Sequence, residues 1–435
     1  MNQSWREEYK SKLMSLQEAV KLVKDGDKIY FGTAGSVPYA LADALYDRKD
    51  ELNDITLFYS HCLRPFKVGK VPHFKVFTYF LSAAERDVLG TPKFDYTSFH
   101  LSQVDLWVRE IAKPNVVFLD VSLPDENGYC SLGISGVTQG RTAIDCAERV
   151  IVQVNKHEPY VLGEGNLVHI SEIDAIVEYD DPLVEYHAQE VTDPRFVKIA
   201  NTIAEQIPDG ACIQFGGGKV IDAMGDSLFH KNDLGIHTEV MNEGMMRLMK
   251  AGNVTNARKG FMPGKTVTSF MVGGREFYDF VDKNEQMYFA PLNVTNNPHN
   301  IAANDNFISV NSCLYIDLLG QVVSESINGV QYTGIGGQVD FVRGAQNSKG
   351  GKSFLTCSST YENRQGVKGS HIVPFIPPRT PVTTSRADVH YICTEYGCVN
   401  LKLLGMRDRT RAIISLAHPD FRDELTDYAK QYGLL

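Results

Sequence analysis

The sequence has no C-x-x-C pair, and its eight cysteines are scattered over 435 residues. Small secreted domains hold their cysteines in a dense disulfide framework, and structural zinc sites commonly use closely spaced pairs. Neither pattern is present here, so we expect every cysteine to be a reduced thiol, as in a cytosolic protein. The cysteines are Cys62, Cys130, Cys146, Cys212, Cys313, Cys357, Cys393 and Cys398.

Long apolar runs and an excess of positive charge are also missing. The N-terminal segment MNQSWREEYKSKLMSLQEAV contains no apolar core of secretory length, and no later segment approaches the ~20 apolar residues that cross a bilayer. The formal net charge is −10, which leaves no overall positive charge to bind nucleic-acid phosphates. These absences predict a cytoplasmic protein without a membrane or nucleic-acid partner.

Several catalytic motifs are absent as well. The stretch HEPY at residues 157–160 lacks the second histidine of a helical zinc site, so we expect no bound metal. Neither a G-x-S-x-G nucleophile elbow nor a G-x-x-x-x-G-K-[ST] phosphate loop occurs. The dinucleotide pattern G-x-G-x-x-G begins with Gly216 and Gly218, but Ile221 occupies its last glycine position, which disfavours a nicotinamide site.

The length and the periodicity of the chain indicate its fold class. A chain of 435 residues exceeds the ~250–300 residues at which a single core stops growing, which predicts two domains. Short strand-like runs such as KIYFG, VVFLDV and CIQFGGG alternate with helix-like stretches, as is typical of parallel α/β sheets. The expected class is therefore α/β, whose ligands bind outside the carboxyl ends of the strands.

The two halves of the chain repeat each other. VKDGDKIYFG matches IPDGACIQFG at an offset of 184, and NDITLFYS then aligns with NDLGIHTE. VFLDV around Asp120 also resembles LYIDL around Asp317. Three segments in the same order indicate two related open α/β domains. The polar stretch VEYDDPLVEYHAQEVTDPRF separates them and predicts domains at residues 1–185 and 186–435.

The repeat directs attention to Glu239. It takes the place of Ser60 in the aligned segments and ends a strand-like run, where a catalytic carboxylate of a parallel sheet would be well placed. Because most glutamates are exposed, a solvated or helix-capping acid is the alternative. Glu243, in MNEGMM, is expected to begin the next helix, where its charge favours the N-terminal dipole.

Two glycine-rich loops are further candidate elements. Gly216, Gly217 and Gly218 follow a strand-like run and precede a helix in QFGGGKVIDAM, so their backbone can approach an anionic oxygen closely. In YTGIGGQVDFVRGA, Gly336 and Gly337 precede a strand-like run. Beside one carboxylate, the two loops can supply N–H donors to a tetrahedral oxyanion. Each loop alone is equally compatible with a tight turn that binds nothing.

Motifs spread over nearly the whole chain carry a family resemblance. They are GIHTE, GQVVSESI and GIGGQVDFVRGA, with TEYG and AHPDFRDEL near the C-terminus. In this order they resemble the acetyl-CoA hydrolase/transferase family of family I CoA-transferases, which includes 4-hydroxybutyrate and butyryl-CoA:acetate CoA-transferases. The resemblance implies a CoA-transferase that uses coenzyme A as substrate and product and holds no permanent cofactor.

The resemblance also assigns residues. The glutamate that forms covalent intermediates with acyl-CoA corresponds to Glu239, whereas Glu243 lies outside the match. Departures from the family pattern are Ile221, where relatives commonly have proline, and Glu362, where many relatives have a lysine. The implied CoA-binding and oxyanion residues are Gly216, Gly217, Gly218, Lys219, Val220, Leu314, Gly336 and Gly337.

The implied reaction is ping-pong transfer of CoA between short-chain carboxylates. Glu239 would form an acyl-glutamyl anhydride and then a glutamyl-CoA thioester. Water must be kept from both intermediates, so we expect an active site between the two domains. Residues 1–185 would line its acyl side, and residues 186–435 would carry Glu239 and the glycine loops.

The acyl pocket has four candidate residues, which follow or end strand-like runs of the first domain: Phe31, Tyr59, Ser60 and His61. Phe31 and Tyr59 suit a short acyl chain but equally suit a domain core. Acetate, butyrate, 4-hydroxybutyrate and dicarboxylates all stay open as substrates. Acyl-CoA hydrolysis and a non-catalytic acyl-CoA sensor are the alternatives, and the family suggests a homo-oligomer, either a dimer or a tetramer.

Overall fold

The computed structural model describes residues 4–187, 191–363 and 365–435. Residues 188–190 of the predicted seam and residues 1–3 of the N-terminal segment therefore lie outside the described part. The chain divides into two compact units, each assembled from separate stretches. The first unit comprises Met1–His187, Val240–Asn242 and Val267–Thr295, and the second comprises Ala188–Glu239, Glu243–Thr266 and Asn296–Leu435.

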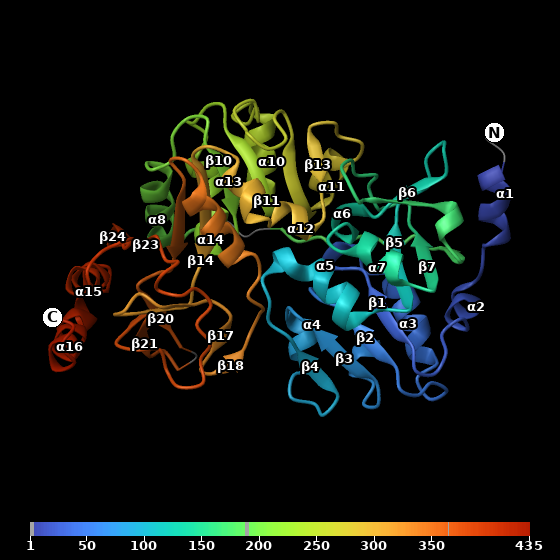
Figure 1. The fold of residues 1–435 in the computed structure, drawn as a ribbon, viewed down its shortest axis with the longest axis horizontal. Helices are drawn as coiled ribbons and strands as arrows, with labels where there is room; N and C mark the ends of the chain where they lie inside the picture. The colour runs from blue at the N-terminus through green and yellow to red at the C-terminus, as the bar shows by residue number, and fades with distance from the viewer. Residues whose placement is uncertain (1–3, 188–190, 364) are drawn as a thin grey trace. The chain divides into compact units, whose positions relative to one another are not determined.

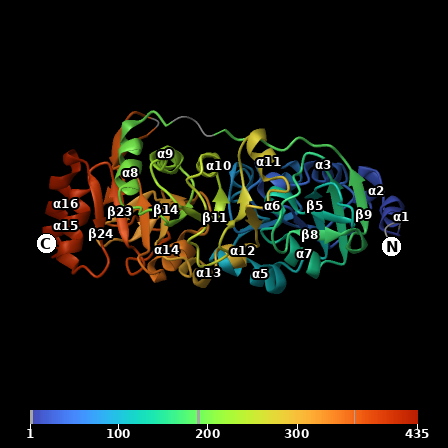
Figure 2. The same ribbon diagram turned by 90° about the horizontal axis from the view of Figure 1, so that it is seen from above.

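The first unit is built on a seven-stranded parallel sheet with the order β4-β3-β2-β1-β5-β7-β9. Its central strand β5, VVFLDV, is buried along its whole length because helices cover both faces of the sheet. Figure 2 shows α3 on one side of β5 and α5 and α7 on the other. The strands are β1 (Lys28–Phe31), β2 (Thr56–Phe58), β3 (Lys75–Thr78), β4 (Phe94–Tyr96), β5 (Val116–Val121), β7 (Arg149–Val154) and β9 (Ala175–Glu178).

The remaining elements of the first unit are short. The helices are α1 (Ser4–Ser11), α2 (Leu16–Val20), α3 (Tyr39–Asp47), α4 (Ala83–Arg86), α5 (Val104–Trp107), α6 (Gly133–Gly136), α7 (Gly140–Cys146), α11 (Arg275–Val281) and α12 (Leu292–Thr295). Strands β6 (Tyr129–Ser131) and β8 (Leu167–His169) pair antiparallel. Strands β12 (Thr266–Met271) and β13 (Met287–Phe289) lie in the stretch Val267–Thr295, except that the first residue of β12 belongs to the second unit.

The second unit has the strand order β11-β10-β14-β19-β23-β24, parallel except for the terminal hairpin. In Figure 2, helices α8, α9 and α10 lie on one side of this sheet, and α13 and α14 lie on the other. The strands are β10 (Cys212–Phe215), β11 (Gly235–Met241), β14 (Phe307–Ser312), β19 (Lys352–Thr356), β23 (Tyr391–Thr394) and β24 (Gly397–Asn400). The helices are α8 (Pro194–Ala204), α9 (Lys219–Ser227), α10 (Glu243–Lys250), α13 (Pro298–Ala302) and α14 (Gln338–Asn347).

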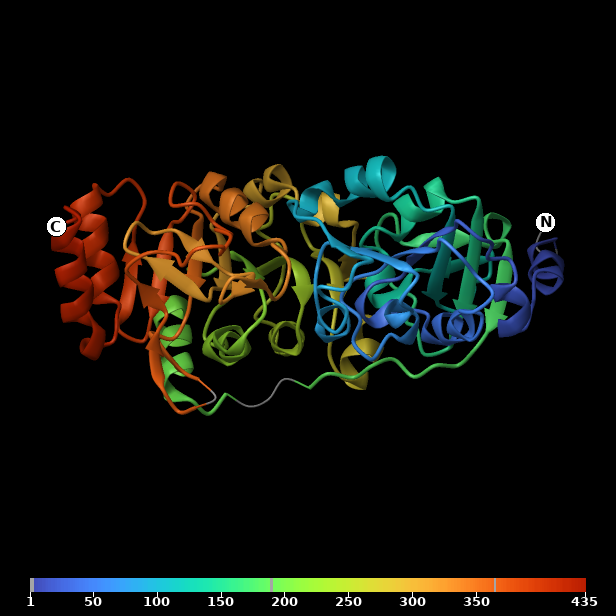
Figure 3. The ribbon, with the colours of Figure 1, turned by 90° about the horizontal axis from the view of Figure 1, so that it is seen from below.

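Small sheets and two C-terminal helices complete the second unit. The coloured ribbons place the C-terminal helices α15 (Met406–Ser415) and α16 (Pro419–Gln431) side by side (Figures 1 and 3). The short strands are β15 (Tyr315–Asp317), β16 (Val322–Val323), β17 (Ser326–Ile327), β18 (Val330–Gln331), β20 (Thr360–Glu362), β21 (Lys368–Ser370) and β22 (Ile372–Val373).

The α/β class and the internal repeat are confirmed by the strand register. Lys28 of β1 faces Thr56 of β2, and Cys212 of β10 faces Gly235 of β11, as the two aligned sequence segments require. The third predicted correspondence is wrong. The strand that pairs with β10 as β5 pairs with β1 is β14, whereas Asp317 belongs to β15 in a separate small sheet. The short motif LYIDL resembles VFLDV in its residues. It does not, however, pair with β10, the strand that corresponds to the neighbour of β5.

Two local predictions concern the segments that follow Gly337 and Glu243. The run after Gly337 is helix α14 and not a strand. Its buried residues Val339, Val342 and Ala345 recur at helical spacing, which favours a helix against the sheet. The prediction that Glu243 begins a helix is confirmed, because it is the first residue of α10.

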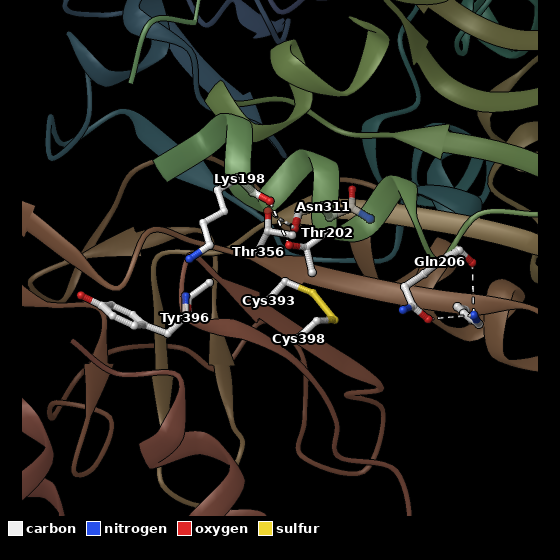
Figure 4. Close-up of a disulfide and its surroundings, with 10 residues drawn as sticks. Lys198, Thr202, Gln206, Asn311, Thr356, Cys393, Tyr396 and Cys398 are labelled. Carbon is white, nitrogen blue, oxygen red and sulfur yellow. Dashed lines mark hydrogen bonds between the residues drawn. A yellow bond between two sulfur atoms is a disulfide. The ribbon is translucent and has the colours of Figure 1, made fainter. Parts of the chain in front are cut away.

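The prediction that all cysteines are reduced thiols is wrong for one pair. Cys393 in β23 and Cys398 in β24 form a disulfide, which is shown in Figure 4. The antiparallel register of the hairpin places the two residues directly opposite each other, so both side chains project from the same face. A sequence separation of five carried no such signal because the hairpin was not predicted. The other cysteines are free.

Neither a membrane-spanning helix nor a metal-ligand cluster is found in the described residues. No described helix has both the length and the apolar character needed to cross a bilayer. No cluster of three or more His, Cys, Asp or Glu side chains in the described part has the arrangement of a metal site.

Candidate active site

Glu239 lies in β11, and its carboxyl group is held by two donors of the second unit. Asn296 donates from Nδ2 to Glu239 Oε2 at 2.6 Å, and the backbone N–H of Gly337 donates to the same carboxyl group. Asn296 is fully buried directly before helix α13, whose N-cap is Asn297. Gly337 is the N-cap of α14, so the carboxyl group also lies at a helix N-terminus, where negative charge is favoured.

The surroundings adjust the acidity of Glu239. Burial raises the pKa of its carboxyl to about 7, and the nearby Asp340 adds to this rise. The hydrogen bonds from Asn296 and Gly337 act in the opposite direction because they stabilise the carboxylate. The group is therefore poised between its acid and its carboxylate near neutral pH, which is the behaviour of many catalytic carboxyls.

This raised pKa predicts a measurable effect on stability. Glu239 keeps a proton in the folded protein between its unfolded pKa of 4.5 and its folded pKa of about 7, so folding becomes less favourable as pH rises through that window. In Glu239→Gln this loss is absent. We expect the variant to gain up to about 3 kcal/mol in free energy of unfolding, relative to the wild type, between about pH 4 and about pH 8.

Urea unfolding at both pH values measures this difference. Glu243→Gln is the matched control, because Glu243 is a partly exposed acid at the start of α10. If the Glu239→Gln and wild-type proteins lose stability in parallel between the two pH values, the Glu239 carboxyl is not buried in its acid form.

The second glycine loop packs directly against Glu239. Gly336 has a φ of 63°, which L-residues with a side chain adopt rarely. Gly337 has an ordinary φ of −85°, but a Cβ atom there would overlap Glu239 Oε2 and Asn296 Nδ2. Position 337 therefore requires glycine for space and not for backbone freedom.

The first glycine loop leaves β10 and enters α9, as the sequence predicted. Gly216 donates its N–H to Val310 of β14, and the Ser312 hydroxyl donates to the Gly217 carbonyl at 2.7 Å. Gly217 and Gly218 are exposed, and Gly218, with a φ of 121°, is the N-cap of α9. The loop thus presents open backbone at the start of a helix, as an anion-binding loop does.

The other positions in and near this loop differ in exposure. Lys219 is the exposed first residue of α9, and its Nζ lies 5.5 Å from the centre of the Phe196 ring. Val220 and Ile221 are buried in the same helix. At position 221, where relatives commonly have proline, this chain therefore has an isoleucine that belongs to the core.

Two further predicted positions lie in the second unit. Leu314 is partly buried between β14 and β15, and its N–H donates to the Val323 carbonyl at 2.8 Å. Glu362 ends β20, is exposed, and faces Lys368 of β21 across the hairpin. The lysine of this hairpin is therefore on the strand opposite Glu362.

The aromatic acyl-pocket candidates lie in the apolar core of the first unit. Phe31 is fully buried, with its ring centroid 5.1 Å from that of Phe66 and 5.3 Å from that of Phe118. Tyr59 packs on the same Phe66 ring at 4.4 Å. Both side chains thus have core neighbours, and a pocket role for either stays a prediction.

The polar candidates of the first unit are also buried. Ser60 is almost fully buried, and its hydroxyl has no hydrogen-bond partner among the described residues. The His61 ring stacks on Phe80 at 3.7 Å and lies 5.7 Å from Phe270. Burial lowers the pKa of His61 to about 3, so its imidazole is neutral at ordinary pH.

Of the predicted residues, the structure brings Glu239 and Gly337 into direct contact. It also identifies Asn296 and Asp340, which the sequence interpretation missed. Asn296 lies in the stretch LNVTNNPHN. An asparagine next to the Asn-Pro start of a helix is typical of a helix cap, so nothing in this stretch predicts that Asn296 binds a carboxylate. Asp340 was missed because its segment was interpreted as a strand.

Comparisons with known proteins agree over the whole chain. The model of the acetyl-CoA hydrolase/transferase N-terminal domain matches residues 1–186, and that of the C-terminal domain matches residues 273–429. Succinyl-CoA:cyclohexane-1-carboxylate CoA transferase of Geobacter metallireducens is 39% identical over 98% of this chain and 97% of its own. The 4-hydroxybutyrate coenzyme A transferase of Clostridium kluyveri is 38% identical over 98% of this chain and 99% of its own.

A solved structure is similar to the same extent. The crystal structure of RipA from Yersinia pestis covers 99% of this chain and 100% of its own, with 38% sequence identity and a TM-score of 0.93. The similarity therefore extends over nearly all residues of both chains.

Proposed function

Because the chain belongs to the acetyl-CoA hydrolase/transferase family and is an enzyme of the CoA-transferase class, we propose that it transfers CoA between short-chain carboxylates by a ping-pong mechanism on Glu239. The observation that carries the proposal is the Glu239 carboxyl, bound by Asn296 and Gly337 and with a pKa of about 7. Such a group is a carboxylate in a large fraction of molecules at neutral pH, as a nucleophile must be.

The reaction follows from that carboxylate. An oxygen of Glu239 attacks the thioester carbonyl of an acyl-CoA, the C–S bond breaks, and CoA leaves as a thiolate from an acyl-glutamyl anhydride. The thiolate then attacks the glutamyl carbonyl, the C–O bond of the anhydride breaks, and the first acid leaves as its carboxylate. A second carboxylate reverses these steps on the glutamyl-CoA thioester. Every bond broken is replaced, so no oxidant or reductant is consumed.

The glycine loops supply the donors in this proposal. Each addition forms a tetrahedral oxyanion, and the N–H of Gly337, which already hydrogen-bonds to Glu239, is placed to donate to it. The proposed contacts to CoA and the oxyanion are Gly216, Gly217, Gly218, Lys219, Val220, Leu314, Gly336 and Gly337. CoA is a substrate and product here, and no cofactor is bound permanently.

The first half of the chain has a separate role in the proposal. We assign residues 1–185 to the acyl side and residues 186–435 to nucleophile and CoA binding. Phe31, Tyr59, Ser60 and His61 are the proposed acyl-pocket residues. The relatives named above act on 4-hydroxybutyrate or on succinyl and cyclohexane-1-carboxylate groups, so monocarboxylates and dicarboxylates are both proposed substrates. We place the enzyme in the cytoplasm as a homo-oligomer, a dimer or tetramer.

Acyl-CoA hydrolysis is the second candidate, because the matching family models include hydrolases. Incubation with an acyl-CoA, with and without an acceptor acid, distinguishes the two activities. Transfer gives a new acyl-CoA only when the acid is present. Release of free CoA at the same rate without an acceptor would favour the hydrolase.

Mass spectrometry of the intermediate tests the mechanism directly. After mixing with an acyl-CoA and trapping with hydroxylamine or borohydride, we expect the modification on Glu239, because only this carboxyl is proposed to form the anhydride and the thioester. Peptide mapping of the trapped protein locates the modified residue. A modification on Glu243, or none in an active preparation, would contradict the assignment.

A further inference from the structure

Glu325 is a buried acid of the second unit that the proposed mechanism does not use. It is 3% exposed and lies between the short strands β16 and β17. One carboxyl oxygen accepts from the Gln331 amide at 2.9 Å and the other accepts from the Thr383 hydroxyl at 3.0 Å. Acceptance at both oxygens is the pattern of an ionised carboxyl. Within the described residues both donors are neutral, and no lysine or arginine forms an ion pair with Glu325.

One oxygen of Glu325 holds the chain just before the second glycine loop. Gln331 ends the hairpin of β17 and β18 (Figure 1), and the Nε2 that it donates to Glu325 also donates to the Thr333 carbonyl at 2.9 Å. The backbone carbonyl of Glu325 accepts from the N–H groups of Tyr332 and Thr333 at 2.8 and 3.1 Å. This segment is therefore fixed to Glu325 immediately before Gly334, where the glycine loop begins.

The other oxygen of Glu325 is connected to the end of the loop. It accepts from Thr383, and the hydroxyl of the next residue, Thr384, accepts from Gln338 Nε2 at 2.8 Å. The backbone of Thr384 also exchanges two hydrogen bonds with the first residue of β16, both at 3.0 Å. Gln338 directly follows Gly337 and begins α14. The loop is thus tied to the surroundings of Glu325 on both sides of Gly337.

These contacts surround the Gly337 N–H of the candidate active site. That N–H donates to the Glu239 carboxyl, and the fit is so close that a Cβ atom at position 337 would overlap Glu239 Oε2. Glu325 itself makes no hydrogen bond to Glu239 within the described residues. Its effect on Glu239 therefore passes through the position of the glycine loop.

We propose that Glu325 is a positioning residue, which holds the Gly337 N–H in place against the Glu239 carboxyl. The inference rests on the proposed function, in which that N–H also donates to the oxyanion. Hydrogen bonds to an ionised acceptor are roughly twice as strong as those between neutral groups, so a carboxylate fixes the loop more firmly than an amide would. Firm placement matters because a displacement of about 1 Å in an active site can cost about 10²-fold in rate.

Glu325→Gln tests the proposal in the full chain. Glutamine can still accept from Thr383, but its amide nitrogen then faces the Gln331 amide nitrogen, and two donors cannot bond to each other. We expect kcat for CoA exchange to fall at least about tenfold, because the oxyanion donor is displaced. The KM for acyl-CoA should change less than about threefold, since ground-state binding does not use this contact.

The pH dependence separates a positioning role from a general loss of stability. The hydrogen bond from Gly337 lowers the pKa of Glu239, so a displaced loop raises that pKa. The acidic limb of the profile of kcat against pH should therefore move to higher pH in Glu325→Gln. Asp340, the charged group that also acts on Glu239, is kept in this variant. Carbon-13 NMR titration of the Glu239 carboxyl, assigned through Glu239→Gln, should show the same shift without any turnover.

Asp317→Asn is the matched control for loss of a buried carboxylate. Asp317 is 1% exposed and also accepts from a glutamine side chain, that of Gln321 at 2.6 Å, but it holds the turn between β15 and β16. This variant should unfold at a lower urea concentration than the wild type, as Glu325→Gln should, because each loses a buried hydrogen bond. Its kcat should stay within about twofold of the wild type, with the acidic limb in place.

Two variants of Thr383 test the same contact if Glu325→Gln does not fold. Thr383→Val keeps the shape of the side chain but removes the hydroxyl that donates to Glu325, so it should lower kcat and move the acidic limb to higher pH. Thr383→Ser keeps the hydroxyl and should retain both values of the wild type.

Two results would overturn the proposal. One is a wild-type kcat and an unshifted acidic limb in Glu325→Gln, while the acyl adduct still forms on Glu239. The other is an equal loss of kcat and an equal shift in Asp317→Asn, which would mean a general loosening of the unit. Failure of the proposed function is a different result, namely the absence of an adduct on Glu239 in the wild type, and the NMR titration still reports in that case whether Glu325 positions the loop.

Discussion

Replacing Glu239 by glutamine is expected to reduce CoA exchange between two carboxylates by at least roughly 10⁴-fold. Glutamine has nearly the same shape and can keep a hydrogen bond with Asn296 and with the Gly337 N–H, so the change removes the nucleophilic oxygen and little else. An uncharged amide cannot form the acyl-glutamyl anhydride. Exchange of a labelled acid into its acyl-CoA measures the loss.

The control for this experiment is Glu243→Gln. Glu243 is four residues further on, at the first position of α10, and the proposed mechanism does not use it. We expect its exchange rate to stay within about twofold of the wild type, since a surface charge near a helix start changes local free energy by only a few tenths to 1 kcal/mol. Equal losses in the two variants would mean that the carboxylates contribute through general electrostatics and that Glu239 is not the nucleophile.

The parts of the site that sequence predicted are those with a local signal. The Gly216 to Gly218 loop was recognisable because a strand-like run precedes it and a helix-like run follows it, and the structure has β10 and α9 there. The repeat directs attention to Glu239, because it aligns the strand of Glu239 with that of Ser60, and the family resemblance then assigns Glu239 as the nucleophile. The pairing of β1 with β2 and of β10 with β11 in equivalent register shows why that alignment was informative.

The missed parts depend on contacts between distant segments. Asn296 is 57 residues from Glu239, and nothing in its own neighbourhood distinguishes it from other helix-capping asparagines. The LYIDL segment was matched to VFLDV although β14 is the true counterpart of β5, because a short apolar run contains no information about which strand it pairs with. The Cys393–Cys398 disulfide was missed for a local reason, since it depends on the register of a hairpin that was not predicted.

Phe31 and Tyr59 illustrate an ambiguity that sequence could not resolve. An aromatic residue at the carboxyl end of a strand can point toward a ligand or into the core, and the two sides differ by one residue of register. Leu57 and Tyr59 alternate with Phe58 across the sheet, and Leu57, Tyr59 and Phe31 contribute to one core cluster while Phe58 contributes to another. Only the packed helices on each face decide which cluster forms.

The second large expected effect is at Gly337, where a single methyl group should reduce CoA exchange on the order of 10²-fold. The φ of −85° at this position is acceptable to alanine, so Gly337→Ala does not strain the backbone. Its Cβ would overlap Glu239 Oε2 and Asn296 Nδ2, so the nucleophile and its donor must both shift. Steady-state kinetics of exchange, together with the rate of adduct formation on Glu239, measure this displacement.

Gly405→Ala is the matched control for Gly337→Ala. Gly405 is the N-cap of α15 as Gly337 is the N-cap of α14, both helices have ten residues, and a Cβ at 405 has no atom within 4 Å. The control should keep full exchange activity and wild-type stability, whereas Gly337→Ala should unfold at a somewhat lower urea concentration, because its Cβ overlaps buried groups and the Cβ at 405 does not. Exchange is therefore compared without urea, where both variants are folded. If Gly337→Ala exchanged CoA as fast as the control, Glu239 would not need the close backbone approach seen here, and the Gly337 N–H would lose its proposed role as oxyanion donor. A loss confined to Gly337→Ala would instead tie catalysis to the position of one carboxyl group relative to one backbone N–H.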